Sequence, residues 1–371
     1  MRLKGALLVG LAAVIAGTGA SIASATQPDG ELVEYSINSD GTGRTQISDF
    51  GPQVDQRMSR TPFDFFSLWR SPNGLLFSIG DLWVGSPGID NPSRTMGLTQ
   101  VLPSGPPLMS SGPFSPDGTW IAFTAGKCYS QETCSSDCQK DCFASYVYVV
   151  KSDGTGLHQV AASGTDASWS ADGKWLTYQG FAGNAADGHD TGIYVVRRDG
   201  KHGRRLVVDG TEPLFAPRDN LIAYRCERNT SMCVVNRDGS GKRVIGTGYS
   251  HISYLNDIWS PDAAKLAVVV PERNQVEPTY YGHLVVLFVN GGKPLTVVRA
   301  ARIEAPLAWS PDGLRIAYRA QTLSQDIDTD EGVYVASTKT HRSTFITDDP
   351  ISESDVEWSS NSELTYLTFV H

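Results

Sequence analysis

The stretch WSPDGLRIAY, residues 309–318, is the clearest copy of a unit that recurs along the chain. The unit consists of an aromatic residue, a Ser-Pro-Asp-Gly turn and a strand with a small residue near its centre. Six further copies follow the same order with varying fidelity and begin at Trp69, Phe114, Trp169, Phe215, Trp259 and Trp358. Neighbouring copies start 44 to 55 residues apart. Such a period is the sequence signature of a repeat architecture, in which each unit packs against the next.

A second unit alternates with the first and consists of a β-branched strand, an Asp-Gly turn and another strand. Its best copies span residues 33–41, 147–154, 193–200 and 232–239, and weaker copies begin near Leu82, Leu284 and Val333. Asp-Gly between two apolar runs is a strong hairpin signal, because glycine adopts a positive φ without a Cβ clash. The two units together therefore predict four short antiparallel strands in each period.

Four strands in about 49 residues are the content of one propeller blade. We expect an all-β fold, a seven-bladed β-propeller of four-stranded antiparallel blades, as a single domain over residues 26–371. Only the second unit is present at the start (residues 33–47), and only the first at the end (residues 358–370). We expect the N-terminal strands to pair with the C-terminal strands and close the ring, which removes exposed sheet edges.

Residues 1–25 have the order of a secretory signal peptide. Arg2 and Lys4 precede an apolar stretch over residues 6–17, and Ala23-Ser24-Ala25 forms a small-residue cleavage site. The apolar stretch is too short to span a bilayer, and no later segment has 18 consecutive apolar residues. We expect an exported protein, periplasmic or secreted, without a membrane span.

The composition excludes several classes of protein. Hydrophobic residues make up 40% of the chain, and 37 Gly and 20 Pro indicate many turns in a globular fold rather than disorder. The formal charge is −9, and no run of Lys and Arg exceeds two residues. Nucleic-acid binding is therefore not expected, because phosphate recognition requires a basic footprint. We expect a monomer.

The six cysteines form two local groups. Cys226 and Cys233 lie on either side of one predicted turn, and an insertion at the corresponding turn of an earlier repeat contains Cys128, Cys134, Cys138 and Cys142. Four thiolates at this spacing could hold zinc. An even cysteine count in an exported chain favours disulfides instead. We expect one Cys226–Cys233 bridge and two bridges of unknown pairing in the insertion.

An acidic segment near the C-terminus resembles the beginning of a calcium loop. Asp326, Asp328 and Asp330 alternate along the chain, followed by Glu331 and a glycine. Ca²⁺ requires six to eight oxygen ligands, and the downstream Glu of an EF-hand is absent. A solvated acidic loop and a calcium site both remain open.

Two more segments offer candidate binding residues on loops that a rigid scaffold would hold. Tyr280, Tyr281 and His283 suit sugar stacking or protein contact, although they could equally pack their own loop. A second cluster could ligate a metal or take part in acid–base chemistry, or could be plain surface, and consists of Asp187, His189 and Asp190.

The two repeat units resemble the WD40-like repeat of the TolB propeller family. The same repeat occurs in the propeller domains of prolyl-oligopeptidase relatives and in polysaccharide lyases. The resemblance covers residues 33–370 and implies the propeller fold, but scaffolds, sensors and enzymes share it, so it implies no single activity. Only residues 26–32 separate the expected leader from the first strand, and we expect no counterpart of the N-terminal domain of TolB.

Two functions are consistent with these patterns. The first is a non-catalytic module that recognises or scaffolds a protein or glycan through the face where loops gather, since no convincing catalytic constellation is present. The alternative is a metal-assisted, glycan-cleaving enzyme that uses dispersed groups of that face, namely His189, His251, His283 and residues 326–331. The enzyme requires several of these groups within a few ångströms of one another.

Overall fold

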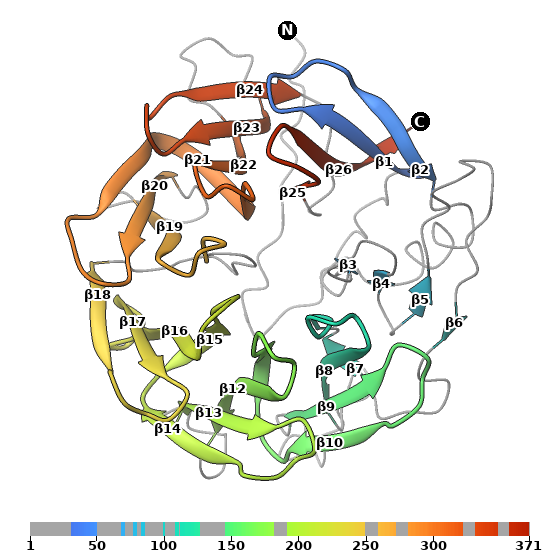
Figure 1. The fold of residues 1–371 in the computed structure, drawn as a ribbon, viewed down its shortest axis with the longest axis vertical. Coiled ribbons are helices and arrows are strands. Elements are labelled where there is room, and N and C mark those ends of the chain that lie inside the picture. Colours follow the sequence, from blue (N-terminus) through green and yellow to red (C-terminus); the bar gives the residue numbers. More distant parts are fainter. Residues whose placement is uncertain are drawn as a thin grey trace, which may run out of the picture.

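A computed structural model of the chain contains antiparallel sheets arranged in a ring (Figure 1). The structure describes residues 31–49, 68–70, 77–79, 83–85, 99–100, 108–110, 112–126, 145–181, 191–248, 259–271, 281–321, 331–347 and 356–370. These residues form 26 strands, and no helix is among them. The expectation of an all-β fold is confirmed. No helix in the described ranges is long and apolar enough to cross a membrane.

Four sheets consist of four strands that follow one another in the sequence. One contains β3 (Leu68–Arg70), β4 (Phe77–Ile79), β5 (Trp83–Gly85) and β6 (Thr99–Gln100). The next contains β7 (Leu108–Ser110), β8 (Trp120–Gly126), β9 (Ser145–Lys151) and β10 (His158–Ala161). The third contains β11 (Thr165–Trp169), β12 (Trp175–Phe181), β13 (Thr191–Arg197) and β14 (Arg204–Val208). The fourth contains β15 (Thr211–Phe215), β16 (Leu221–Cys226), β17 (Ser231–Asn236) and β18 (Arg243–Thr247).

A six-stranded sheet spans two repeats. It contains β19 (Lys265–Pro271), β20 (Tyr281–Phe288), β21 (Leu295–Trp309), β22 (Arg315–Gln321), β23 (Glu331–Ser337) and β24 (Ser343–Thr347). The long strand β21 pairs with β20 through its first half and with β22 through its second half. The first half of β21 is therefore the outer strand of one repeat, and its second half is the inner strand of the next.

The remaining four-stranded sheet joins the two ends of the described chain. Its order is β2 (Thr45–Asp49), β1 (Glu31–Asn38), β26 (Glu363–Val370) and β25 (Val356–Trp358). Strand β1 runs antiparallel to β26 from Glu31, opposite Val370, to Asn38, opposite Glu363. The expectation of four-stranded antiparallel sheets is confirmed in these five sheets.

Small buried residues and tryptophans fill the space between neighbouring sheets. The small residues at the strand centres are fully buried, namely Ala122, Ala223, Ala267 and Ala317. Trp169 is buried, and its indole Nε1 donates a hydrogen bond of 2.9 Å to the carbonyl of Pro113 in the preceding repeat. Trp259 and Trp358 make the same kind of bond, to Leu214 and Ala308. Buried area and one hydrogen bond together therefore connect each of these three repeats to the repeat before it.

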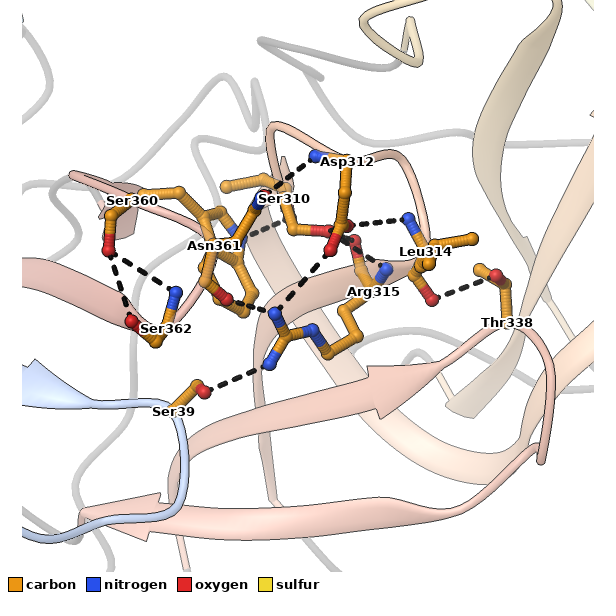
Figure 2. Close-up of polar contacts among 11 residues, drawn as sticks. Ser39, Ser310, Asp312, Leu314, Arg315, Thr338, Ser360, Asn361 and Ser362 are labelled. Atoms are coloured by element: carbon orange, nitrogen blue, oxygen red, sulfur yellow. Dashed lines mark hydrogen bonds and ion pairs between the residues drawn. The ribbon is translucent and has the colours of Figure 1, made fainter.

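Side-chain hydrogen bonds shape each Ser-x-Asp turn. Ser310 Oγ donates to Asp312 Oδ1 at 2.6 Å, and the same carboxylate accepts the N–H of Leu314 at 3.0 Å. Ser310 Oγ in turn accepts the N–H of Arg315 at 2.9 Å (Figure 2). Three other turns repeat this arrangement, beginning at Ser115, Ser170 and Ser260. The motif is therefore explained by local backbone satisfaction.

The sheets have two different ends. The hairpin end holds the Ser-x-Asp turns and the Asp-Gly hairpins. The connection end holds the links from β10 to β11 and from β14 to β15, together with the β16–β17 turn over residues 227–230. These two names are used below.

Candidate functional site

Two carboxylate residues occupy the same position in neighbouring sheets at the connection end. Asp166 in β11 and Glu212 in β15 each stand three residues before the aromatic of their repeat, Trp169 or Phe215. Both have left-handed backbone, with φ of 53° and 50°. The pairing register shifts around both residues, so each belongs to a β-bulge. A non-glycine residue in this conformation is strained, and such strain is concentrated at functional sites.

Two second-strand side chains hold Glu212. The Arg225 guanidinium lies 3.0 Å from the Glu212 carboxylate, and the Arg225 side chain is only 9% exposed. The backbone N–H of Glu212 donates to Gln179 Oε1 of the neighbouring sheet at 3.1 Å. A buried guanidinium requires a carboxylate partner, because an unpaired buried charge is costly. Glu212 is therefore fixed from two sheets.

Asp166 lies in a different environment. Its carboxylate accepts one hydrogen bond, from the Thr165 hydroxyl at 2.9 Å, and the side chain is exposed. The surrounding protein nevertheless dehydrates the carboxyl group and raises the pKa of Asp166. Burial also raises the pKa of Glu212; Arg225 opposes this rise, and the neighbouring Asp166 carboxyl adds to it. Two coupled carboxyl groups with raised pKa values form a candidate functional site.

A disulfide joins β16 and β17, the two strands that follow Glu212 in the same sheet. Cys226 follows Arg225 in β16 and is bonded to Cys233 in β17, which confirms the predicted bridge. The adjacent turn is tied to β15 by a hydrogen bond of 2.5 Å from the Thr211 hydroxyl to Asn229 Oδ1. The disulfide and this bond restrain the strands that hold Arg225 against Glu212. The other cysteines lie outside the described residues, namely Cys128, Cys134, Cys138 and Cys142.

The structure describes only part of the candidate set from the sequence. His283 lies in β20, opposite Val270, and is half-buried. The backbone of Tyr281 begins β20 and that of Glu331 begins β23. The remaining predicted binding and metal residues lie outside the described residues: Tyr280, Asp187, His189, Asp190, His251, Asp326, Asp328 and Asp330. The calcium site and both loop clusters therefore stay predictions.

No group of three His, Cys, Asp or Glu side chains in the described ranges is arranged to hold a metal ion. The Asp166–Glu212 pair supplies two carboxylates, one of which already faces Arg225. This geometry suits hydrogen bonding to a ligand more than cation coordination, since metal sites gather more ligands.

Sequence reasoning missed the Asp166–Glu212 pair. A signal was present, because aligning the copies on their aromatic residue places both acids in the same position. The partners were harder to find. The strand pairing sets Gln179 opposite Thr165 and Arg225 opposite Thr211, beside the two acids. This pairing depends on the β-bulges, which the sequence does not reveal.

Comparison with known proteins shows the fold alone. No protein-family model and no curated protein matches the chain. The chain is similar to an oligogalacturonate lyase in complex with manganese, at 11% identity and a TM-score of 0.54, covering 93% of this chain and 99% of the lyase. It is similar to puromycin hydrolase at 14% identity and a TM-score of 0.55, covering 87% of this chain and 53% of the hydrolase. A putative TolB from Agrobacterium tumefaciens is 15% identical, with a TM-score of 0.48 and coverage of 93% and 100%. The fold is that of a β-propeller.

Proposed function

We propose that this chain is an exported, non-catalytic β-propeller that recognises a protein or glycan ligand through the connection end of its sheets. The observation that carries the proposal is the Asp166–Glu212 pair. Two partly dehydrated carboxyl groups are held on strained backbone in neighbouring sheets, although the repeat itself does not require an acid there. Non-glycine residues that adopt strained, left-handed backbone where the repeat does not require them are expected at functional positions.

The proposal includes the architecture that positions the pair. The sheets form a closed ring of seven blades over residues 26–371, with the β2-β1-β26-β25 sheet as the blade that joins both ends. The count of seven is supported by the six-stranded sheet, since β21 belongs to two repeats. Residues 1–25 are the leader, and the Cys226–Cys233 bridge supports an oxidising compartment.

The chemistry of the pair indicates the groups that it would bind. Arg225 balances the charge of Glu212, whereas the Thr165 hydroxyl is the one hydrogen-bond donor to the Asp166 carboxylate among the described residues. Asp166 can therefore accept further hydrogen bonds from a ligand. Sugar hydroxyls and peptide N–H groups both donate such bonds, and bonds to a charged acceptor are stronger than neutral ones.

A glycan and peptide array probed with residues 26–371 tests this function. We expect wild type to bind a defined set of array members and Asp166→Asn to lose that binding, with a melting temperature no lower than that of wild type. Asp153→Asn is the matched control, because Asp153 is a carboxylate in a hairpin-end turn. Unchanged binding by both Asp166→Asn and Glu212→Gln would contradict a site at the connection end.

Metal-assisted cleavage of a glycan is the second candidate function. It is favoured by the shared fold of the manganese-bound oligogalacturonate lyase and by half-buried His283 in β20. Calorimetric titration with Mn²⁺, together with analysis of the array glycans for shortened products, separates the two functions. Tight uptake and cleavage, both lost in His283→Ala, would replace the recognition role with an enzyme.

Calcium binding by the acidic segment belongs to the same proposal. Asp326, Asp328, Asp330 and Glu331 would supply part of a Ca²⁺ shell that orders the ligand-binding face. Calorimetric titration with Ca²⁺ should release heat and raise the melting temperature. Absence of both effects would remove the cation from the proposal and leave a solvated acidic loop.

A further inference from the structure

A basic surface lies at the hairpin end of two neighbouring sheets, away from the Asp166–Glu212 pair. It is formed by the β13–β14 hairpin (residues 197–205) and the β17–β18 hairpin (residues 236–243). These segments contain eight Lys and Arg and two Asp, a net charge of +6 in a chain whose net charge is −9. The corresponding segments 38–45 and 151–158 each contain one basic and one acidic residue. The hairpin over residues 337–343 contains two basic residues and no acid, but the largest net charge, +4, lies in residues 197–205, directly beside the +2 of residues 236–243.

Direct contacts hold the two hairpins of the basic surface side by side. The Arg204 guanidinium donates to the backbone carbonyl of Arg237 at 2.6 Å and to that of Asp238 at 3.1 Å. Arg204 thus links the first hairpin to the second. The cations of both hairpins therefore belong to one continuous surface.

The first hairpin lacks a hydrogen bond that three other Asp-Gly hairpins have. In three hairpins, a hydroxyl two residues after the Asp donates to its carboxylate at 2.6–2.7 Å; the pairs are Thr42–Asp40, Thr155–Asp153 and Ser240–Asp238. Lys201 stands at this position after Asp199 and contributes only its backbone N–H, at 3.0 Å. The lysine therefore replaces a residue that would stabilise the turn.

The next residue departs from the repeat as well. His202 has a φ of 58°, and the corresponding residues are Gly43, Gly156 and Gly241, with φ of 69°, 70° and 66°. Left-handed backbone is strained for a residue with a Cβ atom. At two consecutive exposed positions, a lysine and a histidine therefore stand where the residues of three other hairpins would stabilise the turn better. Such exceptions mark positions kept for another purpose.

The cations of the basic surface are accessible. Arg197, Lys201, Arg204 and Lys242 are exposed. Neither lysine ammonium group has a hydrogen bond to a described residue, and Arg197 approaches Asp199 only to 3.9 Å. Arg197, Lys201 and Lys242 are therefore available to an external partner, whereas Arg204 also holds the two hairpins together.

We propose that this basic surface docks an acidic segment of a partner protein. Asp199 and Asp238 stand among the cations, and hydrogen bonds to Lys201 and Ser240 lower the pKa of each carboxyl. These fixed negative charges repel every anion, so the choice of a peptide over a sulfate or phosphate chain rests on the apolar side chains beside the cations. Val244, 44% exposed, and Leu157, 39% exposed, also offer apolar contact. Leu157 precedes His158, whose ring nitrogen lies 2.7 Å from the Arg198 carbonyl. Charged and apolar contacts together are typical of protein interfaces.

Fluorescence anisotropy with a labelled twelve-residue peptide of alternating Glu and Ser tests the proposal, using residues 26–371. We expect binding that weakens as salt rises and that weakens about tenfold in the Lys201→Glu/Lys242→Glu variant, as expected for reversing two exposed charges. Lys339→Glu, on the exposed part of another hairpin, is the control and should bind like wild type. An equal loss in the control would overturn the proposal.

A second variant separates binding from folding. Lys201→Thr/His202→Gly installs the residues that the other hairpins use, so we expect a higher melting temperature and weaker peptide binding. A lower melting temperature together with weaker peptide binding would indicate that Lys201 and His202 have a structural role, and would overturn the proposal. Binding to heparin but not to the peptide would also overturn it, in favour of an anionic glycan.

Discussion

The hairpin end and the connection end of the sheets handle the same residue type in opposite ways. Asp172, in a hairpin-end turn, accepts hydrogen bonds from the Ser170 hydroxyl and the Lys174 N–H. Although burial opposes them, these bonds lower the pKa of Asp172. Only six residues earlier, Asp166 at the connection end has a raised pKa because the surrounding protein dehydrates it. The first carboxylate is a structural part of its turn, and the second is available for a ligand.

This difference between Asp172 and Asp166 distinguishes residues that stabilise a turn from residues that the folded strands hold at the surface. Within the Ser-x-Asp turns of the hairpin end, the contacts that shape each turn join residues close in sequence, as Ser310 with Asp312. Connection-end contacts join residues from different strands or sheets, as Glu212 with Arg225 and with Gln179. Local contacts form wherever the motif occurs, whereas the longer-range contacts require the neighbouring strand or sheet to be in place.

Removing a tryptophan between two sheets should have the largest effect. Trp169→Ala deletes a buried indole and its bond to Pro113, so we expect a loss of about 3–5 kcal/mol in the free energy of unfolding. Trp169→Phe keeps most of the ring and should cost about 1 kcal/mol for the lost hydrogen bond. Urea denaturation measures both. Equal costs for the two variants would show that the ring does not fill the gap between repeats.

These contrasts explain what the sequence could predict. The Trp169 position, the Ser310–Asp312 turn and the buried Ala317 follow from local motif chemistry, and the structure confirms them. The Cys226–Cys233 bridge was predictable because its partners flank one turn. The Asp166–Glu212 pair was not predicted, because its partners come from different strands through β-bulges that shift the register. Patterns with a period of two do not reveal where a bulge falls.

Removing the disulfide should have the next largest effect, and it should act at the connection end. We expect Cys226→Ala/Cys233→Ala to lower the free energy of unfolding by about 2–3 kcal/mol, because the closed loop is short. The variant should also lose array binding, because Arg225 loses its support. Urea denaturation with and without reductant provides the control. The urea midpoint of wild type should fall on reduction. An equal fall in the midpoint of the variant would contradict a stabilising role for this bridge.

Substitution of Arg315 tests a hairpin-end contact between β22 and the sheet that joins the two ends of the described chain (Figure 2). Its guanidinium donates to Ser39 Oγ at 3.0 Å and to the Asn361 carbonyl, and it lies 4.9 Å from the ring centre of Trp358. A lysine keeps the charge but loses the fork of donors. We expect Arg315→Lys to cost about 1–2 kcal/mol in urea denaturation. Arg342→Lys, at an exposed position, is the control. Similar costs for both would mean that the fork contributes nothing.

The smallest effects should have opposite signs at the two ends. The pKa of Asp166 is raised above its ordinary value of 3.8, so the folded state holds the proton more tightly than the unfolded state. Its carboxylate therefore lowers stability as pH rises from below 3.8 through the raised pKa, and Asp166→Asn should be more stable than wild type at pH 7. Although burial opposes them, hydrogen bonds from Ser310 and Leu314 lower the pKa of Asp312. Its carboxylate stabilises the fold above 3.8 and loses that effect as pH falls through the lowered pKa.

Asp312→Asn should therefore be less stable than wild type at pH 7, and both differences should shrink as the solution is acidified. Each should stay below about 1 kcal/mol, because both side chains are in contact with solvent. Thermal denaturation of both variants across the acidic range measures the signs. Destabilisation by both substitutions at pH 7 would mean that Asp166, like Asp312, is a structural residue, and the distinction between the two ends would no longer hold.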